Sequence, residues 1–402
     1  MKDVERFIEY AKLPTMSCED SENCPSTEKQ RVLAEKAARE LRTLGLDVTL
    51  TENCYVYAKL SANAPAKNRI GLIAHMDTSP DAPDCNIKPR IVKYDGGDIC
   101  LNEEKNLYLS PSDYPCLEKY AGSELIVTDG TTLLGADDKA GVCEIIAAIE
   151  RIVREGLPHG DISVAFTPDE EIGRGADLFD VELFGADYAY TVDGGALGEI
   201  EYENFNAASA VVEIEGVSIH PGSAKGKMLN AAEIAAQFTM MLPEKEKPFY
   251  TEKYEGFYHL TSIEGTVEKA VLKYIIRDHD REKFEERKRA FENASAALNH
   301  EFDGAKVNCT VKDSYYNMKE KIEPVMYVVD RAKTAFAENG VAPVTVPIRG
   351  GTDGARLSFM GLPCPNLSTG GENFHSRFEF LPVDSFKKMI DVIVTIVTDL
   401  TE

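Results

Sequence analysis

The chain has 402 residues, which is enough for two or more domains with hydrophobic cores of their own. Its formal net charge of −24 argues against nucleic acid and anionic membranes as partners, because both repel an acidic protein. Nine cysteines without a Cys-x-x-Cys pair predict free, reduced thiols rather than a disulfide framework. The N-terminal segment lacks the apolar core of a signal peptide, and no apolar run approaches about 18 residues, so we expect a cytoplasmic protein.

The first 160 residues predict helices that alternate with short apolar strands. Helices are expected over Val4–Ala11, over Thr27–Leu44 with Ser26 as its cap, and over Val142–Val153. Strands are expected over Val48–Leu50, Tyr55–Leu60 and the apolar run that begins at Ile70. Residues 80–130 are rich in Pro, Asp and Gly and show no clean period, so we expect an extended, partly irregular flap there.

Two further apolar strands, Asp161–Thr167 and Tyr188–Val192, precede a change of pattern after residue 207. The order of elements then becomes β-α-β-β-α-β, which is typical of a ferredoxin-like α+β domain. These elements are expected over Ala210–Val217, Asn230–Leu242, Tyr258–Ile263, Val267–Ile276, Arg281–His300 and Lys306–Lys312. We therefore predict a domain of residues 208–317 inserted between two parts of one α/β domain, 1–207 and 318–402.

The last part returns to the α/β style of the first. Helices are expected over Val325–Asn339 and Val383–Thr401, and strands over Val344–Ile348 and Pro363–Ser368. The segment that begins at Arg349 reads as a tight loop. It lacks the Lys-Ser/Thr and the strand–helix context of a phosphate-binding loop.

Histidine and carboxylate side chains follow several of these strands. His75 and Asp77 lie two residues apart at the end of one strand, Glu170 and Glu171 follow the next, and Asp193 follows a third. In open α/β sheets this edge binds ligands. A lone His-x-Asp fits a strand that ends in a polar turn equally well.

The collected set also includes Asp137 and Asp138, where a strand leads into a helix, and His375 near the C-terminus. A helix cap explains one aspartate but not an adjacent pair. Imidazole nitrogens and carboxylate oxygens suit zinc or a similar divalent ion. Five such ligands with one bridging carboxylate would make a two-metal hydrolytic centre that produces hydroxide near neutral pH.

Several motifs resemble the peptidase T family, the tripeptide aminopeptidase branch of the co-catalytic di-zinc exopeptidases that include aminoacylases and carboxypeptidases. They are A-H-M-D-T-S-P-D, L-L-G-A-D-D-K-A-G, T-P-D-E-E, Y-T-V-D-G-G, V-S-I-H-P-G-S-A-K-G, Y-I-I-R-D, P-I-R-G-G-T-D-G-A and the segment around His375. The resemblance covers almost the whole chain. It implies an α/β catalytic domain with a mixed, largely parallel sheet flanked by helices, and an inserted ferredoxin-like lid and dimerisation domain.

The resemblance also implies two zinc ions per subunit and a role for each site residue. His75 and Asp193 correspond to the ligands of one zinc, Glu171 and His375 to those of the other, and Asp137 to the bridge. Asp77 corresponds to the carboxylate that orients His75, and Glu170 to the general base. The groups that contact the substrate correspond to His220, Asn230, Arg277 and Arg349. A cis peptide bond between Asp137 and Asp138 and a homodimer through the inserted domain are implied as well.

Without the resemblance, some of these residues have simpler explanations. His220-Pro221-Gly222 reads as a plain turn, and Arg277 as a partner of Asp278 or Asp280. Both explanations stay open at this point.

The sequence thus predicts a cytoplasmic di-zinc aminopeptidase that removes the N-terminal residue from tripeptides, through a metal-bridged hydroxide with Glu170 as the general base. Two alternatives remain. One is a non-catalytic peptide- or metal-binding protein on the same fold, which would not need Glu170 beside a metal ligand. The other is a related di-zinc amidohydrolase that acts on dipeptides or N-acyl amino acids.

Overall fold

The computed structural model describes residues 2–400, which form two compact units. Unit 1 holds the described residues up to 202, 320–346 and those from 352 onward, and unit 2 holds residues 203–319 and 347–351. Unit 1 is thus formed by residues on both sides of unit 2 in the sequence. Within residues 2–400, no helix is long and apolar enough to cross a membrane.

An eight-stranded mixed sheet forms the centre of unit 1, in the order β1-β2-β8-β3-β9-β16-β10-β15. Four neighbouring strands in its middle, β8, β3, β9 and β16, run parallel. The strands are β1 (Asp47–Leu50), β2 (Val56–Leu60), β3 (Ile70–His75), β8 (Ile162–Thr167), β9 (Tyr188–Gly194), β10 (Glu199–Glu201), β15 (Val344–Thr345) and β16 (Asn366–Ser368). Every residue of β3 and β8 is buried, as expected for parallel strands covered on both faces.

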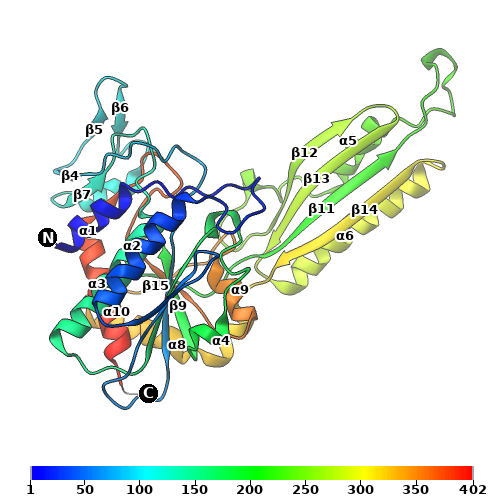
Figure 1. The fold of residues 1–402 in the computed structure, drawn as a ribbon. Coiled ribbons are helices and arrows are strands. Elements are labelled where there is room, and N and C mark those ends of the chain that lie inside the picture. Colours follow the sequence, from blue (N-terminus) through cyan, green and yellow to red (C-terminus); the bar gives the residue numbers. More distant parts are fainter. Residues whose placement is uncertain (1, 401–402) are drawn as a thin grey trace. The chain divides into compact units, whose positions relative to one another are not determined.

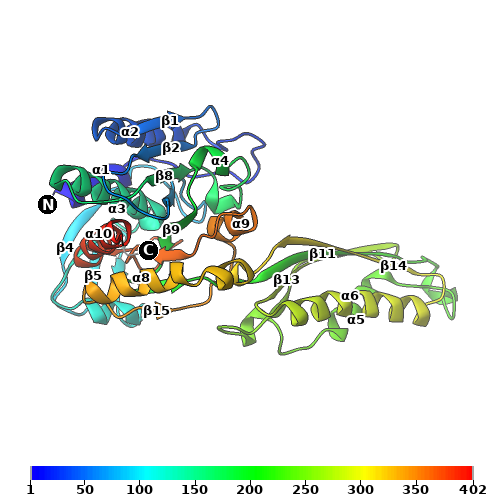
Figure 2. The same cartoon turned by 90° about the horizontal axis from the view of Figure 1, so that it is seen from below.

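Helices cover both faces of this sheet (Figures 1 and 2). On one face α3 packs against β3 and β9, and α1 and α10 pack onto α3. On the other face α4 and α9 contribute to the apolar cluster around Ile73. The helices outside unit 2 are α1 (Lys2–Ala11), α2 (Lys29–Thr43), α3 (Ala136–Glu155), α4 (Val181–Phe184), α7 (Lys319–Ile322), α8 (Tyr327–Glu338), α9 (Asp353–Phe359) and α10 (Val383–Thr398).

The segment 80–130, expected to be an extended, partly irregular flap, contributes short strands to two small sheets. The first has the strand order β17-β7-β4, and the second is the hairpin of β5 and β6. Their strands are β4 (Arg90–Lys93), β5 (Ile99–Asn102), β6 (Leu107–Leu109), β7 (Glu124–Val127) and β17 (Leu381–Pro382). The sequence did not indicate the individual strands, because they are only three or four residues long and β7 pairs with β17, about 250 residues later in the chain.

Helix ends also differ from the predictions. Helix α2 begins at Lys29, and Ser26 does not cap it, because the Ser26 hydroxyl donates a hydrogen bond to Asp169 at 2.5 Å. Helix α9 was missed within the expected loop after Arg349. Helix α10 ends at Thr398, and the predicted end at Thr401 lies outside the described residues.

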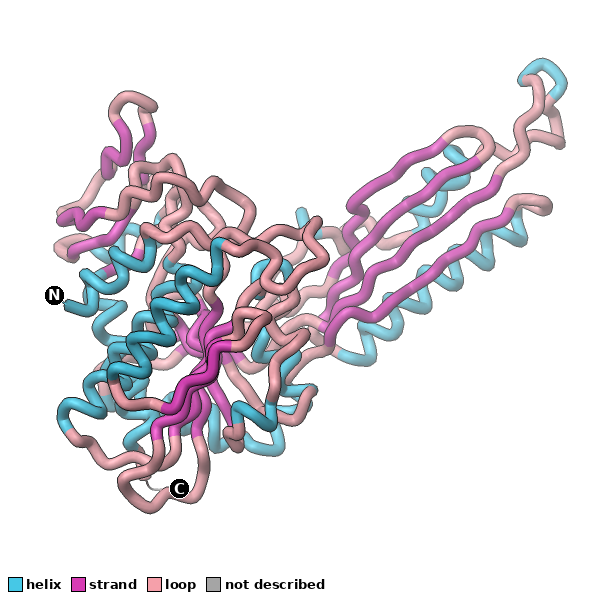
Figure 3. Tube along the Cα trace, in the orientation of Figure 1, coloured by secondary structure: helices cyan, strands magenta, loops and turns pink. Residues whose placement is uncertain are grey.

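Unit 2 is a four-stranded antiparallel sheet in the order β12-β13-β11-β14, with α5 and α6 packed on it (Figure 3). Its elements are β11 (Asn206–Glu215), α5 (Ala231–Met241), β12 (Phe257–Gly265), β13 (Lys269–Asp278), α6 (Arg281–Glu301) and β14 (Lys306–Tyr315). This succession and strand order are those of a ferredoxin-like domain, so the predicted fold class is confirmed. The core between sheet and helices contains Phe238, Phe284 and Phe291, all without exposed surface.

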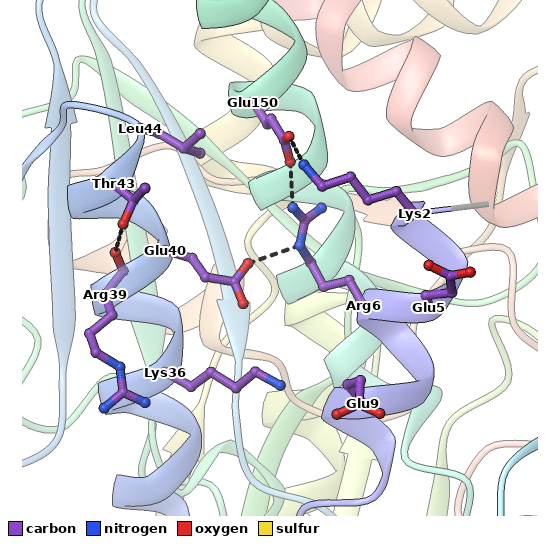
Figure 4. A pocket seen from close by; sticks show the side chains of 10 residues that line it. All are labelled: Lys2, Glu5, Arg6, Glu9, Lys36, Arg39, Glu40, Thr43, Leu44 and Glu150. Carbon is purple, nitrogen blue, oxygen red and sulfur yellow. Dashed lines mark hydrogen bonds and ion pairs between the residues drawn. The ribbon is translucent and has the colours of Figure 1, made fainter.

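An ion-pair network ties the first helix to the rest of unit 1 (Figure 4). It lines a cavity of about 590 Å³ between α1, α2 and α3. The side chain of Arg6 is only 9% exposed, and its Nε donates to Glu40 at 2.9 Å while its Nη2 donates to Glu150. Lys2 also pairs with Glu150. The charged groups in the middle of the cavity therefore neutralise one another and join three helices.

We predict that Arg6→Ala lowers the free energy of unfolding by about 2–3 kcal/mol, because the partly buried Glu40 loses its charged donor and Glu150 keeps only Lys2. Urea unfolding followed by circular dichroism measures this. Lys12→Ala is the control, since the Lys12–Glu9 pair is exposed to solvent and its loss should leave the stability almost unchanged. Equal effects of the two changes would contradict the role given to Arg6.

Candidate active site

Four elements of unit 1 bring histidine and carboxylate groups to one edge of the central sheet. His75 is the last residue of β3, Asp193 lies near the end of β9, and Glu170 and Glu171 follow β8. The neighbouring ends of parallel strands deliver these side chains to the same place, as sequence reasoning expected. Asp137 comes from the first turn of α3.

The carboxylate of Asp137 lies between two imidazole rings. Its Oδ1 is 2.8 Å from Nε2 of His75, and its Oδ2 is 3.4 Å from Nε2 of His375. Nε2 of His75 also lies 3.2 Å from Asp193, and Nε2 of His375 lies 2.9 Å from Glu171. The cluster therefore has two halves, one with His75 and Asp193 and one with His375 and Glu171, which share Asp137.

Asp77 supports both the histidine and the glutamate pair. Nδ1 of His75 lies 3.0 Å from the Asp77 carbonyl oxygen and 3.3 Å from the Asp77 carboxylate. The same carboxylate accepts the backbone N–H groups of Glu170 at 2.9 Å and Glu171 at 3.1 Å. The Asp77 side chain has no exposed surface. It thus fixes the ring of His75 relative to the turn of Glu170 and Glu171, which follows β8.

Glu170 lies against the His75–Asp193 half. The potential ligand atoms of Glu170, His75 and Asp193 all lie within 4.8 Å of one another. Glu170 and Glu171 belong to a short 3₁₀ turn rather than to an extended segment. Burial, followed by repulsion from Asp193, raises the pKa of Glu170 well above its usual range.

The peptide bond between Asp137 and Asp138 is cis, as the family resemblance implied. Asp138 does not point into the cluster. Its carboxylate accepts the backbone N–H of His75 at 3.0 Å and that of Gly141 at 3.1 Å. Of the adjacent pair, one aspartate lies between the histidines and the other holds the end of β3 to the start of α3.

The donor set fits divalent cations. Burial lowers the pKa of His75, but attraction to Asp193 and hydrogen bonds to Asp137 and Asp193 outweigh this and raise it well above its usual value. Hydrogen bonds with Asp137 and Glu171 raise the pKa of His375 to about 11. The carboxylates therefore favour positive charge at both imidazoles. Groups that could hold a metal are His75 with Asp137 and Glu171, and His75 with Glu170 and Asp193.

Sequence reasoning missed three carboxylates that contact this cluster. Asp81 lies 3.0 Å from Nδ1 of His375, on the side of the ring away from Glu171. Asp353 donates its backbone N–H to Glu170 at 3.3 Å. Glu379 accepts the backbone N–H of Asp137 at 3.0 Å. Asp81 follows Asp77 by four residues and Glu379 follows His375 by four, but outside a helix such a spacing does not indicate a contact.

Two of the four predicted substrate residues have local roles in unit 2. His220 is exposed and begins a short 3₁₀ turn, where its Nδ1 accepts the N–H of Gly222 at 3.2 Å. Asn230 caps α5, because its Oδ1 accepts the N–H of Ala232 at 3.1 Å. The structure therefore places His220 in the turn that its sequence suggested and gives Asn230 a capping function.

The two predicted arginines of unit 2 donate to backbone carbonyls. Arg277 donates to Ala208 at 3.2 Å and to Ile276 at 2.9 Å, and its guanidinium lies 5.4 Å from the ring centre of Tyr315. It does not form the surface pair with Asp278 or Asp280 that was its simpler explanation. The guanidinium of Arg349 binds carbonyl oxygens of residues 251–255 and stacks on Phe205 and Phe257.

All nine cysteines are free. Cys54, Cys143 and Cys364 are buried, whereas Cys85 and Cys100 are exposed. The prediction of free thiols is therefore confirmed, and none of the nine belongs to the groups that could hold a metal.

Comparison with known proteins gives consistent results. The family described as the peptidase dimerisation domain matches residues 202–303. The peptidase T of Alkaliphilus oremlandii is 56% identical over 400 residues, 98% of either chain, and that of Clostridium novyi is 54% identical over 398 residues with the same coverage.

Solved structures share the fold over almost the whole length. The aminopeptidase PepT of Bacillus cereus superposes with a TM-score of 0.79 at 24% identity, covering 100% of this chain and 98% of that one. A tripeptidase of Staphylococcus aureus gives 0.78 at 23% identity, with 99% and 97% covered. A dinuclear metal-binding peptidase of the M20 family from Bacillus subtilis gives 0.65 at 14% identity, with 99% and 97% covered.

We predict that Asp77→Asn lowers kcat/KM for peptide hydrolysis by roughly 10–100-fold. The amide places an NH₂ group against one of the two backbone donors of Glu170 and Glu171, so the turn that carries both glutamates loses a hydrogen bond. Steady-state kinetics measure the loss. Asp187→Asn, at an exposed pair with Arg69, is the control and should leave the rate unchanged. Normal activity of Asp77→Asn would show that this carboxylate does not position the site.

Proposed function

Since the chain belongs to the peptidase T family, we propose that this peptidase removes the N-terminal residue from tripeptides and uses two zinc ions to do so. The observation that carries the proposal is Asp137, which one imidazole contacts on each side. The 56% identity to a peptidase T along 98% of both chains supports the same activity.

In this proposal the two halves of the cluster are two metal sites. His75 and Asp193 hold one ion, His375 and Glu171 hold the other, and Asp137 bridges them. The dinuclear metal-binding peptidase of the same fold supports the number of ions. Imidazole nitrogen and carboxylate oxygen without thiolate suit zinc in a catalytic site. Asp77 and Asp81, on the outer nitrogens of His75 and His375, keep both rings oriented.

The metal pair supplies positive charge that lowers the pKa of water and polarises a peptide carbonyl. Glu170 takes the proton of the attacking water at its carboxylate and then gives it to the leaving amine. Burial raises the pKa of Glu170 above its usual range, and this favours acceptance of a proton by its carboxylate. The backbone N–H of Asp353 keeps Glu170 oriented.

We assign substrate recognition to unit 2 and to the same unit of the second subunit in the proposed homodimer. His220 helps hold the reacting carbonyl. The substrate backbone or carboxylate is bound by Asn230, Arg277 and Arg349, and unit 2 pairs two subunits into a homodimer. The match to the peptidase dimerisation domain and the tripeptidase of the same fold support these assignments. Nine free thiols suit a cytoplasmic enzyme.

A panel of peptides tests the proposed activity. With zinc present, we expect hydrolysis of tripeptides with a free amine at a rate at least about tenfold above that of matched dipeptides, tetrapeptides and N-acetylated tripeptides, which is a difference of about 1.4 kcal/mol in activation free energy. Mass spectrometry should show one free amino acid and one dipeptide as products. Preferred cleavage of the N-acetylated or dipeptide substrates would instead indicate an amidohydrolase.

The role of Glu170 is tested separately from metal binding. Glu170→Gln keeps the shape of the side chain and removes the proton acceptor, so kcat should fall by roughly 10²–10⁴-fold while two zinc ions remain bound. Elemental analysis of the purified variant measures the zinc, and Glu182→Gln at an exposed position of α4 is the control. Loss of zinc together with activity would make Glu170 a ligand of the His75–Asp193 half.

A further inference from the structure

Glu379 is a buried carboxylate that contacts the segment carrying Asp137 from outside the cluster. Its Oε2 accepts the backbone N–H groups of Leu134 and Gly135, both at 2.8 Å, and its Oε1 accepts that of Asp137 at 3.0 Å. The residue is only 2% exposed. Three donors on two oxygens require that both oxygens accept, and in this geometry only a carboxylate provides that.

The segment that Glu379 holds has little freedom to move. Gly135 adopts a left-handed conformation with φ +73°, and a Cβ there would lie 3.1 Å from Thr78 and 3.2 Å from Nζ of Lys139. Lys139 is itself without exposed surface and donates to the carbonyl oxygen of Leu13 at 2.7 Å. Packing and hydrogen bonds together therefore determine where the main chain of Asp137 lies.

Backbone hydrogen bonds also hold the segment that carries Glu379. Glu372 and Phe380 exchange two backbone hydrogen bonds of 2.9 and 3.0 Å, which close the loop that carries His375. The N–H of Glu379 donates to the carbonyl oxygen of Ser376 at 3.1 Å, and Leu381 pairs with Ile126 in the small sheet. One short segment thus presents His375 to the cluster and Glu379 to the main chain of Asp137.

We propose that Glu379 is a positioning residue, which fixes the bridging carboxylate of Asp137 relative to His375 and thereby sets the affinity of both metal sites. The inference rests on the proposed function, in which Asp137 binds both ions. It follows that a change at Glu379 weakens the two sites together, because the group it positions belongs to both. A residue that only stabilised the fold would lower the melting temperature without changing zinc affinity.

Glu379→Gln isolates the effect. An amide has one acceptor oxygen, so in either orientation its NH₂ group faces at least one backbone N–H of the Asp137 segment. Glu379→Asp keeps both acceptor oxygens but withdraws them by one methylene. Glu372→Gln is the matched control, because its carboxylate belongs to the same loop and accepts from the hydroxyl of Tyr120 at 2.7 Å, not from the Asp137 segment.

The experiment measures zinc binding to the metal-free full-length proteins by competition with a chromophoric chelator, together with their melting temperatures and their kinetics at saturating zinc. We expect wild type and Glu372→Gln each to bind two zinc ions. For each ion, the affinities of the two proteins should agree within threefold. Glu379→Gln should bind both ions roughly 10–100-fold more weakly. At saturating zinc its kcat should be lower, with KM unchanged.

If Glu379→Gln binds two zinc ions with affinities within threefold of wild type, the inference is wrong. The proposed function would not be affected by that result. If Glu379→Gln does not fold, Glu379→Asp tests the inference instead. We expect it to bind zinc at least fivefold more weakly than wild type. Wild-type zinc affinity of Glu379→Asp would contradict the inference. A wild-type protein that binds no zinc would overturn the proposed function and this inference with it.

Discussion

One carboxylate shared by two imidazoles is the constraint on which the rest of the site depends. Asp137 lies 2.8 Å from His75 and 3.4 Å from His375, although these residues are separated by up to 300 positions in the chain. A pair of cation sites with a common ligand requires all of its groups to be placed to within a fraction of an ångström. The parallel centre of the eight-stranded sheet supplies that precision, because neighbouring strands end at one edge.

Buried carboxylates that accept backbone N–H groups extend this precision to the loops. Asp77 holds the turn of Glu170 and Glu171, Asp138 holds the end of β3, and Glu379 holds the segment of Asp137. Burying a charge costs free energy, and hydrogen bonds to the charged form offset that cost. These carboxylates thus either face the proposed metals or hold the main chain that carries the proposed ligands.

Sequence reasoning succeeded where local pattern and chemistry agree. The buried strands β3, β8 and β9 were predicted from apolar runs, and the residues brought together at their ends were predicted from chemical type and from family resemblance. It failed where a distant contact decides the structure. Ser26 binds Asp169 instead of capping α2, strands β4 and β7 pair within a sheet completed by residue 381, and the contacts of Glu379 have no local sequence signal.

Anomalous diffraction from crystals grown with zinc, recorded on both sides of the zinc absorption edge, tests the central claim most directly. The account predicts two zinc peaks in each subunit, one bonded to His75 and Asp193 and the other to His375 and Glu171, with a different oxygen of Asp137 on each. A single peak, or two peaks of which only one contacts Asp137, would contradict it.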